Sequence, residues 1–357
     1  MPTGEPTPAS GPDKEPDPLA PATLTADAAP AGGLAKSAPE RVDVAVNIFA
    51  KPHQTALSVL SLLRESGPHV GTVWLQYEPM GSRYDRVSPY VVARYLKEVL
   101  HWPCRVSQPE HWLALEAPDM ARLDDAAYRL SIRYQDAFEH SESRKLLLMH
   151  NDVYVFGDAL GEMLAAMGDA FAIGQLGQCW RCPAHAAQVV QDVMGQAPCT
   201  PERYEDFRPD AAALRGLYAH ARELGVAVRP YEECFTEFFD RQPWPLPECR
   251  VNEWFCLLDL ERTRPHCMPF GPALPPGAFG ACGRYNLDTS VPWFRAMHAL
   301  GFRARHFDYK RYLRHWVGTG KMSASRYTMA EDNARKLLAK HFPDYMAWLR
   351  GSDQKPI

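Results

Sequence analysis

Residues 42–77 read VDVAVNIFAKPHQTALSVLSLLRESGPHVGTVWLQY, and the order of their apolar and polar residues predicts the fold class. Val42–Ala50 is a short apolar run rich in β-branched residues, which is typical of a strand buried within a parallel sheet. Lys51–Thr55 breaks the run, and leucines at helical spacing follow as far as residue 66. Val70–Tyr77 is a second strand. A strand, a helix and a strand at this spacing predict a βαβ unit, with parallel strands and a right-handed crossover.

The rest of the chain continues this alternation at first and then loses it. From Gly174 to about Gly283, cysteine, proline and tryptophan interrupt the pattern, and only Ala211–Leu224 is clearly helical. The other expected elements are helices over Tyr90–Leu100, Leu123–Glu139, Phe156–Met167, Val291–Leu300 and Met329–Leu338, and strands over Lys145–Leu148 and Arg303–Phe307. The sequence therefore predicts an α/β fold with a Rossmann-like, mostly parallel sheet flanked by helices, and an irregular, cysteine-rich insertion.

The charge balance excludes one class of function. Lysine and arginine number 39 against 43 aspartate and glutamate, a net charge of −4, which argues against a nucleic-acid binder held by bulk positive charge. No apolar stretch reaches the roughly 18 residues of a membrane span, and the N-terminus lacks the basic and apolar segments of a secretory signal. We therefore expect a cytoplasmic protein with no transmembrane segment and no nucleic-acid partner; peripheral association with a membrane stays open.

Polar side chains stand at the ends of three predicted strands: Asn47 with Lys51, then Glu78, then the triplet His150-Asn151-Asp152. In open parallel sheets, ligands bind outside the carboxyl ends of the strands, so these positions indicate a nucleotide crevice. No Gly-x-Gly-x-x-Gly follows the first strand and no Walker loop occurs anywhere, which argues against dinucleotide and P-loop sites.

Asp152 allows two interpretations. A carboxylate at a strand end suits Mg²⁺ or Mn²⁺, because these ions take oxygen ligands and leave positions open for substrate phosphates. An aspartate at this place is equally typical of the N-cap of the helix that follows. The triplet alone does not favour either interpretation.

Two segments resemble the GT-A glycosyltransferases of the family-2 type. Val46–Leu63 is similar to the first strand and helix of that family, which hold the nucleotide sugar. Ser131–Tyr134 followed by Leu147–Asp152 is similar to the arginine-containing helix and the strand that ends in Asp-x-Asp, with His150 in place of the first aspartate. The resemblance implies a GT-A-like fold in which Asp152 and His150 hold a metal ion. The donor-binding residues that it implies are Asn47, Lys51, Glu78, Arg133, Asn151 and Lys321; Lys51 and Arg133 are otherwise ordinary surface cations.

A third segment extends the resemblance. Leu287–Phe302 followed by His315–Ser323 is similar to the family block in which an acidic residue precedes a helix and a histidine precedes a Gly/Ser loop. This implies that Asp288 is the general base and that His315 completes the metal site. The family has a Glu-Asp pair where this chain has Leu287-Asp288, so only one carboxylate is present. Asp288 is otherwise the cap of the helix from Val291, and His315 is otherwise an ordinary surface or core histidine.

A polar and aromatic cluster at Arg250–Phe255 supplies reserve candidates. Glu253 is the base if Asp288 serves only as a helix cap. Trp254, like Trp244 and Trp293, offers an apolar face for a sugar ring, although tryptophan is more often a packing residue.

Together these resemblances imply a metal-dependent, inverting glycosyltransferase. It moves a sugar from a nucleotide-diphosphate donor to a carbohydrate or other hydroxyl acceptor, with Mn²⁺ or Mg²⁺ as cofactor. A non-catalytic binding or scaffolding protein on the same fold and a nucleotidyltransferase remain the alternatives. The expected divisions are 1–40, a disordered tail rich in Pro and Ala; 41–170, the nucleotide-sugar-binding half; 171–283, the Cys- and Trp-rich insertion on the acceptor side; and 284–357, the C-terminal part of the catalytic domain with its closing helix.

The chain contains nine cysteines. Secreted disulfide scaffolds are usually short and have an even number of cysteines, so the length of this chain and its odd number of cysteines both argue against that class. Cys179 and Cys182 form a C-x₂-C pair that is typical of a zinc knuckle, and Cys199 and Cys234 follow as candidate ligands. A structural Zn²⁺ is therefore one interpretation of these residues. Disulfide bonds and buried thiols are the others.

Overall fold

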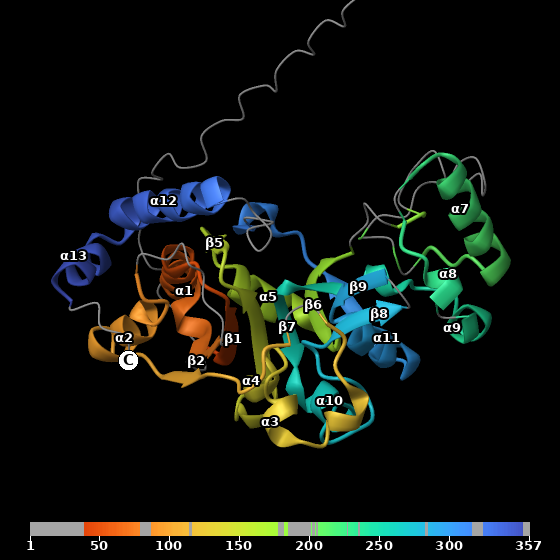
Figure 1. The fold of residues 1–357 in the computed structure, drawn as a ribbon, viewed down its shortest axis with the longest axis horizontal. Coiled ribbons are helices and arrows are strands. Elements are labelled where there is room, and N and C mark those ends of the chain that lie inside the picture. Colours follow the sequence, from red (N-terminus) through yellow and green to blue (C-terminus); the bar gives the residue numbers. More distant parts are fainter. Residues whose placement is uncertain are drawn as a thin grey trace, which may run out of the picture. The chain divides into compact units, whose positions relative to one another are not determined.

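A seven-stranded sheet forms the centre of the structure, a computed structural model (Figure 1). Its neighbouring strands run parallel, except that one strand, β7 (Val251–Asp259), is antiparallel to both of its neighbours. The predicted α/β class with a mostly parallel sheet is confirmed. The strands in spatial order are β10 (Ala304–His306), β6 (Ala172–Leu176), β7 (Val251–Asp259), β4 (Lys145–His150), β1 (Val42–Ile48), β2 (Val70–Tyr77) and β3 (Cys104–Ser107).

The structure describes residues 39–78, 87–113, 116–177, 182–184, 201, 204, 206–226, 228–234, 236–282, 285–315 and 324–352. The predicted tail lies outside the described residues, apart from its last two positions. Residues 39–357 belong to one unit, and the expected divisions within it at residues 170 and 283 stay predictions. Among the described residues, no helix combines the length and the hydropathy of a membrane span.

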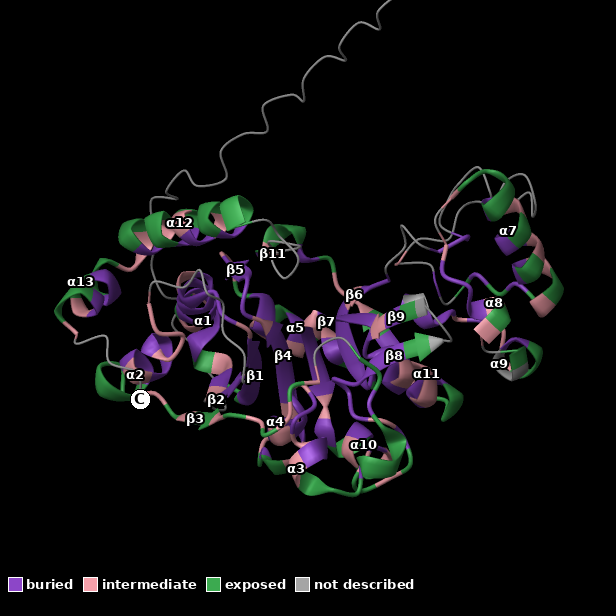
Figure 2. Ribbon diagram, in the orientation of Figure 1, coloured by how far each residue is buried: buried purple, intermediate pink, exposed green. Residues whose placement is uncertain are grey.

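The predicted βαβ unit is present. β1 is buried along its whole length and pairs in parallel with β2, as a central strand with two covered faces does. Between them, α1 (Pro52–Ser66) begins at a proline. Proline is favoured at this position because an N–H group in the first turn of a helix would have no intrahelical acceptor. α1 is buried around most of its circumference because β5 (Val153–Val155) and α12 (Ala324–His341) both pack on it (Figures 1 and 2).

Two predicted helices are shorter in the structure. The segment Leu123–Glu139 is divided into α3 (Ala126–Arg129) and α4 (Gln135–His140), and Tyr134, directly before α4, has a left-handed backbone with φ of 64°. The helix predicted from Phe156 begins only after Asp158. The other α-helices are α2 (Val91–Glu98), α3 (Ala126–Arg129), α4 (Gln135–His140), α5 (Ala159–Met167), α7 (Ala211–Glu223), α8 (Tyr231–Cys234), α9 (Thr236–Arg241), α10 (Leu260–Thr263), α11 (Val291–Ala299) and α13 (Pro343–Gly351).

Two strands of the central sheet come from the segment that the sequence predicts to be irregular, so that prediction is wrong at β6 and β7. β7 pairs with both β4 and β6, and Leu257 lies opposite Leu147 and Ile173. Its polar residues Asn252 and Glu253 stand between Val251 and the apolar run Trp254–Leu258, so the strand shows no alternation. An apolar run this short is typical of a buried strand and of a buried helix segment alike. Two further pairs are also made of short strands: β5 with β11 (Leu313–His315), and β8 (Phe279–Cys282) with β9 (Tyr285–Thr289).

The core under α11 includes one histidine. The ring of His298 packs against the rings of Phe171 and Phe294, with centroid separations of 6.1 and 4.4 Å. Burial lowers the pKa of His298 to about 4, and the charges of Arg303 and Arg208 act in the same direction. The imidazole is therefore neutral in the folded protein at pH 7.

We expect the His298→Leu variant to lose less stability than the wild type as the pH falls. The unfolded chain takes up a proton at His298 near pH 6.5, whereas the folded chain does so only near pH 4. Between these values the free energy of unfolding of the wild type falls by about 1.4 kcal/mol per pH unit through this residue, and the variant lacks this contribution. Urea denaturation at several pH values in this window measures both slopes. Equal slopes would contradict the expectation.

Candidate functional site

Side chains from several strands meet at the carboxyl edge of the parallel strands. Asn47 in β1 lies opposite His150 at the end of β4. β7 runs in the opposite direction, so its first residues, including Glu253, reach the same edge. Predicted site residues from distant parts of the chain therefore lie at the edge where an open parallel sheet binds its ligands.

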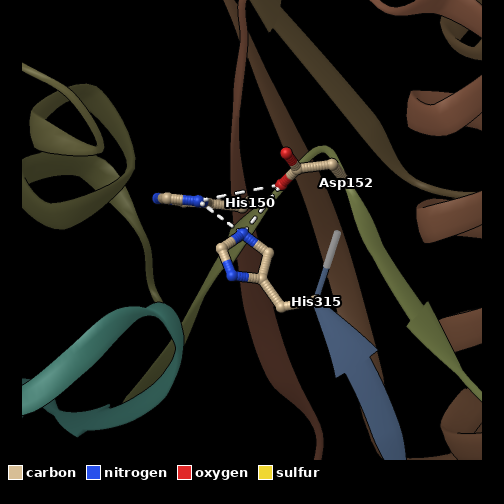
Figure 3. Close-up of side chains that lie close together, drawn as sticks. All are labelled: His150, Asp152 and His315. Carbon is tan, nitrogen blue, oxygen red and sulfur yellow. Dashed lines mark hydrogen bonds and ion pairs between the residues drawn. The ribbon is translucent and has the colours of Figure 1, made fainter. Parts of the chain in front are cut away.

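Three side chains form a cluster of potential metal ligands: His150, Asp152 and His315 (Figure 3). His315 Nε2 lies 3.0 Å from Asp152 Oδ1 and 3.3 Å from His150 Nδ1, and His150 Nδ1 lies 3.8 Å from the same oxygen. Atoms that bind one divalent ion at about 2.0–2.2 Å lie about 3 to 3.5 Å from one another. The triangle of donor atoms therefore fits a single ion with little rearrangement.

A pair of three-residue strands brings His315 to Asp152. β11 runs antiparallel to β5, and His315 lies opposite Val153, the residue that follows Asp152. The indole of Trp254 stacks on the imidazole of His315, with ring centroids 4.6 Å apart and an angle of 8° between the planes. This stack fixes the plane of the imidazole, so Trp254 supports a candidate metal ligand.

Asp152 is buried and ionised. Its second oxygen, Oδ2, lies 2.8 Å from the ammonium group of Lys51. Burial by itself raises the pKa of Asp152, but the hydrogen bond from His315 and the charge of Lys51 outweigh it and hold that pKa well below its usual range. Burial lowers the pKa of His150 to about 3, and the neighbouring His315 adds to this shift. A carboxylate and a neutral imidazole are the protonation states that bind metals.

Both helix-cap interpretations are wrong. α5 is capped by Asp158, whose carboxylate accepts a hydrogen bond from the Gly161 N–H, whereas Asp152 precedes β5. α11 begins after Ser290, and Asp288 lies within β9 instead. The backbone of Asp288 has φ of 120°. Residues other than glycine rarely adopt such a conformation, and those that do cluster at functional sites.

Lys51 reaches Asp152 from a strained turn between β1 and α1. Ala50 and Lys51 both have a left-handed backbone, with φ of 55° and 59°, a conformation that costs about 1–2 kcal/mol per residue. The side-chain amide of Asn151 donates to the Ala50 carbonyl at 3.1 Å and to the Thr55 hydroxyl at 3.0 Å. Asn151, which the resemblance places on the donor, therefore holds this turn.

A second cluster of charges lies beside the metal-ligand cluster. The guanidinium group of Arg250, which is 1% exposed, lies 3.3 Å from Glu253 Oε2 and 3.2 Å from Asp288 Oδ2. Arg229 approaches the same Asp288 oxygen at 3.4 Å. Glu253 Oε1 in turn lies 3.8 Å from His150 Nε2. The contacts therefore continue from the candidate metal ligands to both candidate bases.

The two candidate bases differ in their exposure. The side chain of Asp288 is 29% exposed, whereas that of Glu253 is 8% exposed. Burial raises the pKa of Glu253 above its usual value, and the charge of Arg250 offsets this only in part. Asp288 is thus the carboxylate that is more accessible to a molecule from solvent, whereas Glu253 is buried against His150.

A small pocket lies at the ends of β1 and β2. Glu78 lines this pocket. Its carboxylate accepts hydrogen bonds from the Asn47 amide at 2.7 Å and from the Trp112 indole at 3.0 Å, and it pairs with Arg133 at 3.1 Å. Thr289, the residue after Asp288, also lines this pocket. Three of the predicted donor-binding residues therefore share one pocket beside the candidate base.

Some predicted residues do not join this arrangement. Lys321, Cys179 and Cys199 lie outside the described residues. Cys234 is disulfide-bonded, so its predicted role as a zinc ligand is wrong, because the metal ligand is the thiolate. Cys182 is buried.

Two arginines of the second cluster are missing from the sequence-based candidates. Arg250 is the first residue of the polar and aromatic cluster Arg250–Phe255, and a cation so close to the acidic residue Glu253 is the signal that identifies it. Arg229 has no motif around it, because it meets Asp288 only through the fold. Trp244 and Trp293, predicted as sugar platforms or packing residues, are both buried packing residues.

No protein-family model and no curated protein matches this chain. Solved structures resemble it, and the matches include a mannosyltransferase from Pyrobaculum calidifontis in complex with GDP-Man and Mn²⁺. The identity is 12%, the match covers 90% of this chain and 68% of the other, and the TM-score is 0.39. Mouse xyloside xylosyltransferase 1 matches at 15% identity over 76% of this chain and 86% of its own, with a TM-score of 0.35. The mannosyltransferase Ktr4p from S. cerevisiae in complex with GDP matches at 12% identity. This match covers 64% of this chain and 59% of Ktr4p, and the TM-score is 0.30.

These three proteins are glycosyltransferases by name. Likeness at TM-scores of 0.39 and below says nothing about donor, acceptor or mechanism.

Proposed function

We propose that this chain transfers a sugar from a nucleotide-diphosphate donor to a hydroxyl group of a carbohydrate or other acceptor, with a divalent metal ion and with inversion at the anomeric carbon. One observation carries the proposal. Candidate metal ligands and two candidate bases form a continuous series of contacts beside a pocket at the carboxyl edge of the sheet. Such a transfer needs these groups together, because the acceptor must lose a proton while the diphosphate leaves.

The charges of the described site residues balance one another before any donor binds. The ion pairs are Lys51 with Asp152, Arg133 with Glu78, and Arg250 and Arg229 with Glu253 and Asp288. A bound diphosphate adds about two negative charges, and a buried charge is costly unless it is paired. Among the described residues, the metal-ligand cluster is where a divalent ion can bind and supply positive charge to pair with the diphosphate.

The residues present fit a divalent ion at this cluster. Asp152 Oδ1 faces both imidazoles, while Oδ2 lies against Lys51, so an ion bound at Oδ1 leaves the ion pair of Asp152 with Lys51 intact. When bound, the ion stabilises the negative charge that develops on the leaving diphosphate. Lys51 lies next to the cluster and supplies a second positive charge there.

Asp288 is the base that the geometry favours. It is the more exposed of the two carboxylates, and Arg250 and Arg229 hold its position. Its carboxylate takes the proton of the acceptor hydroxyl while the hydroxyl oxygen attacks the anomeric carbon on the face opposite to the leaving group, which inverts the configuration. Glu253 orients His150 from behind, as carboxylates do for many metal-binding histidines.

We expect Mn²⁺ to bind at least about tenfold more tightly than Mg²⁺, because two of the three donors are imidazole nitrogens, which suit transition metals better than Mg²⁺. Titration of the metal-free protein with Mn²⁺, followed by EPR and by competition with Mg²⁺, measures this ratio. His315→Asn should weaken Mn²⁺ binding. His140→Asn is the control. His140 ends α4 and precedes the start of β4, whereas His150 lies at the end of β4, so this change should leave Mn²⁺ binding unchanged. Equal affinities for the two ions would be inconsistent with this donor set.

Nucleotide sugars test the proposed function directly. The protein is loaded with Mn²⁺ and incubated with UDP-, GDP-, ADP- and dTDP-sugars, with and without simple sugar acceptors, and the released nucleoside diphosphate is measured. Release from one donor, abolished by chelation of the metal, supports the proposal. No release from any donor, together with no thermal stabilisation by any nucleoside diphosphate in the presence of Mn²⁺, overturns it and favours a non-catalytic protein on this fold.

A further inference from the structure

Two side chains of α12 reach the turn that carries Lys51. Figure 1 shows α12 alongside α1. The carboxylate of Glu331, 9% exposed, accepts hydrogen bonds from the backbone N–H groups of His53 at 2.9 Å and Gln54 at 3.1 Å. It also contacts the side chains of both residues, each at 3.0 Å. The hydroxyl of Tyr327 accepts a hydrogen bond from the Lys51 N–H at 2.9 Å.

These contacts replace a cap that α1 lacks at its own N-cap residue, Lys51, which makes no capping hydrogen bond with its side chain. Pro52 at the first helical position has no N–H. The N–H groups of His53 and Gln54 are among the donors that an α-helix leaves without an intrahelical partner. Glu331 supplies acceptors for both, and its negative charge lies at the positive end of the helix dipole.

The same contacts constrain the conformation of Lys51. Ala50 and Lys51 have a left-handed backbone, which residues other than glycine keep only where the surrounding structure imposes it. Asn151 holds the turn at the Ala50 carbonyl, and α12 holds it at the Lys51 N–H and at the next two N–H groups. In this conformation the Lys51 ammonium lies 2.8 Å from Asp152.

We propose that Glu331 and Tyr327 are positioning residues of the site: they hold the turn in the geometry that keeps the Lys51 ammonium against Asp152 and in place for the donor diphosphate. The consequence for donor binding rests on the proposed function, whereas the placement of Lys51 does not. Both residues act through Lys51 and not on the reacting atoms. When their contacts are removed, the turn relaxes and Lys51 leaves Asp152.

Chemical labelling of Lys51 tests the placement without any substrate. In the wild type the side chain is buried and paired, so its amine reacts slowly with acetic anhydride. We expect Tyr327→Phe and Glu331→Gln to raise the labelling rate of Lys51, followed by peptide mass spectrometry, by at least about tenfold, with circular dichroism showing an intact fold. Asp332→Asn removes the adjacent carboxylate of α12, which pairs with Arg335 at the surface, and should leave the rate unchanged.

A double-mutant cycle tests whether these residues act through Lys51. In the presence of Mn²⁺, Tyr327→Phe is expected to weaken binding of UDP, GDP or ADP, whichever the wild type binds best, by about tenfold. In a Lys51→Met background the same change should add little, because both changes remove one interaction.

Each outcome decides between the two claims. Unchanged labelling of Lys51 in both Tyr327→Phe and Glu331→Gln overturns the inference, as do additive losses of nucleotide binding in the cycle. If the wild type binds none of these nucleotides, the proposed function fails instead. The labelling rates then still decide whether Glu331 and Tyr327 position Lys51.

Discussion

Asp288→Asn is expected to lower kcat for sugar transfer by about 10²- to 10⁴-fold, the usual contribution of a general base, while donor binding stays close to that of the wild type. Asparagine keeps the shape of the side chain and an oxygen for Arg250 and Arg229, but it cannot take the proton of the acceptor hydroxyl. Steady-state kinetics gives kcat, and a titration with the nucleoside diphosphate in Mn²⁺ gives the binding constant.

Two variants show whether this loss is specific to Asp288. Asp259→Asn changes an aspartate at the far end of β7 that caps α10, and should leave kcat unchanged. Glu253→Gln changes the buried carboxylate beside His150. We expect it to reduce the affinity for Mn²⁺ by a larger factor than it reduces kcat measured at saturating Mn²⁺. Full activity in Asp288→Asn together with an inactive Glu253→Gln would move the role of base to Glu253. A product with retained anomeric configuration would exclude direct displacement.

Asp152→Asn is expected to weaken Mn²⁺ binding by at least about 100-fold, because removal of a ligand costs no less than removal of the residues that orient ligands. Loss of the ion should then lower kcat by about 10²- to 10⁴-fold, since a bound metal contributes several kcal/mol to a transition state of this kind. EPR of bound Mn²⁺ and the rate of nucleotide-sugar turnover measure the two effects. Unchanged turnover would remove the metal from the mechanism.

The buried pair of Asp152 with Lys51 requires its own control. Removing one partner leaves the other as an uncompensated buried charge, which typically costs about 3–5 kcal/mol of stability. The double variant Lys51→Met/Asp152→Asn removes both charges, and we expect it to recover most of the stability lost in Asp152→Asn. Mn²⁺ binding should stay lost in the double variant. Recovery of Mn²⁺ binding would show that misfolding, and not the missing ligand, explains the single change.

The parts of the fold that the sequence predicts correctly are those formed by neighbouring residues. β2 spans the predicted residues, β1 ends two residues earlier than predicted, and α7 and α11 each end within one residue of the prediction. Each of these elements buries a regular pattern of apolar side chains, so its periodicity is visible in the chain itself. β7 is less regular, because two of its first residues bind other polar groups: the Asn252 amide donates to the Gly177 carbonyl, and Glu253 pairs with Arg250.

The amino-acid sequence predicts which polar side chains stand at the strand ends: Asn47, Glu78 and His150–Asp152 lie near or just after the ends of apolar runs. The groups that complete the site around them depend on contacts that form only in the folded chain. His315 comes to Asp152 through a pair of three-residue strands, Arg229 comes to Asp288 from a segment without a motif, and Glu331 caps a helix that lies far before it in the chain. These contacts join residues distant in sequence through single ion pairs and hydrogen bonds. Such contacts leave no periodicity in the chain, and they form only after the apolar elements have packed.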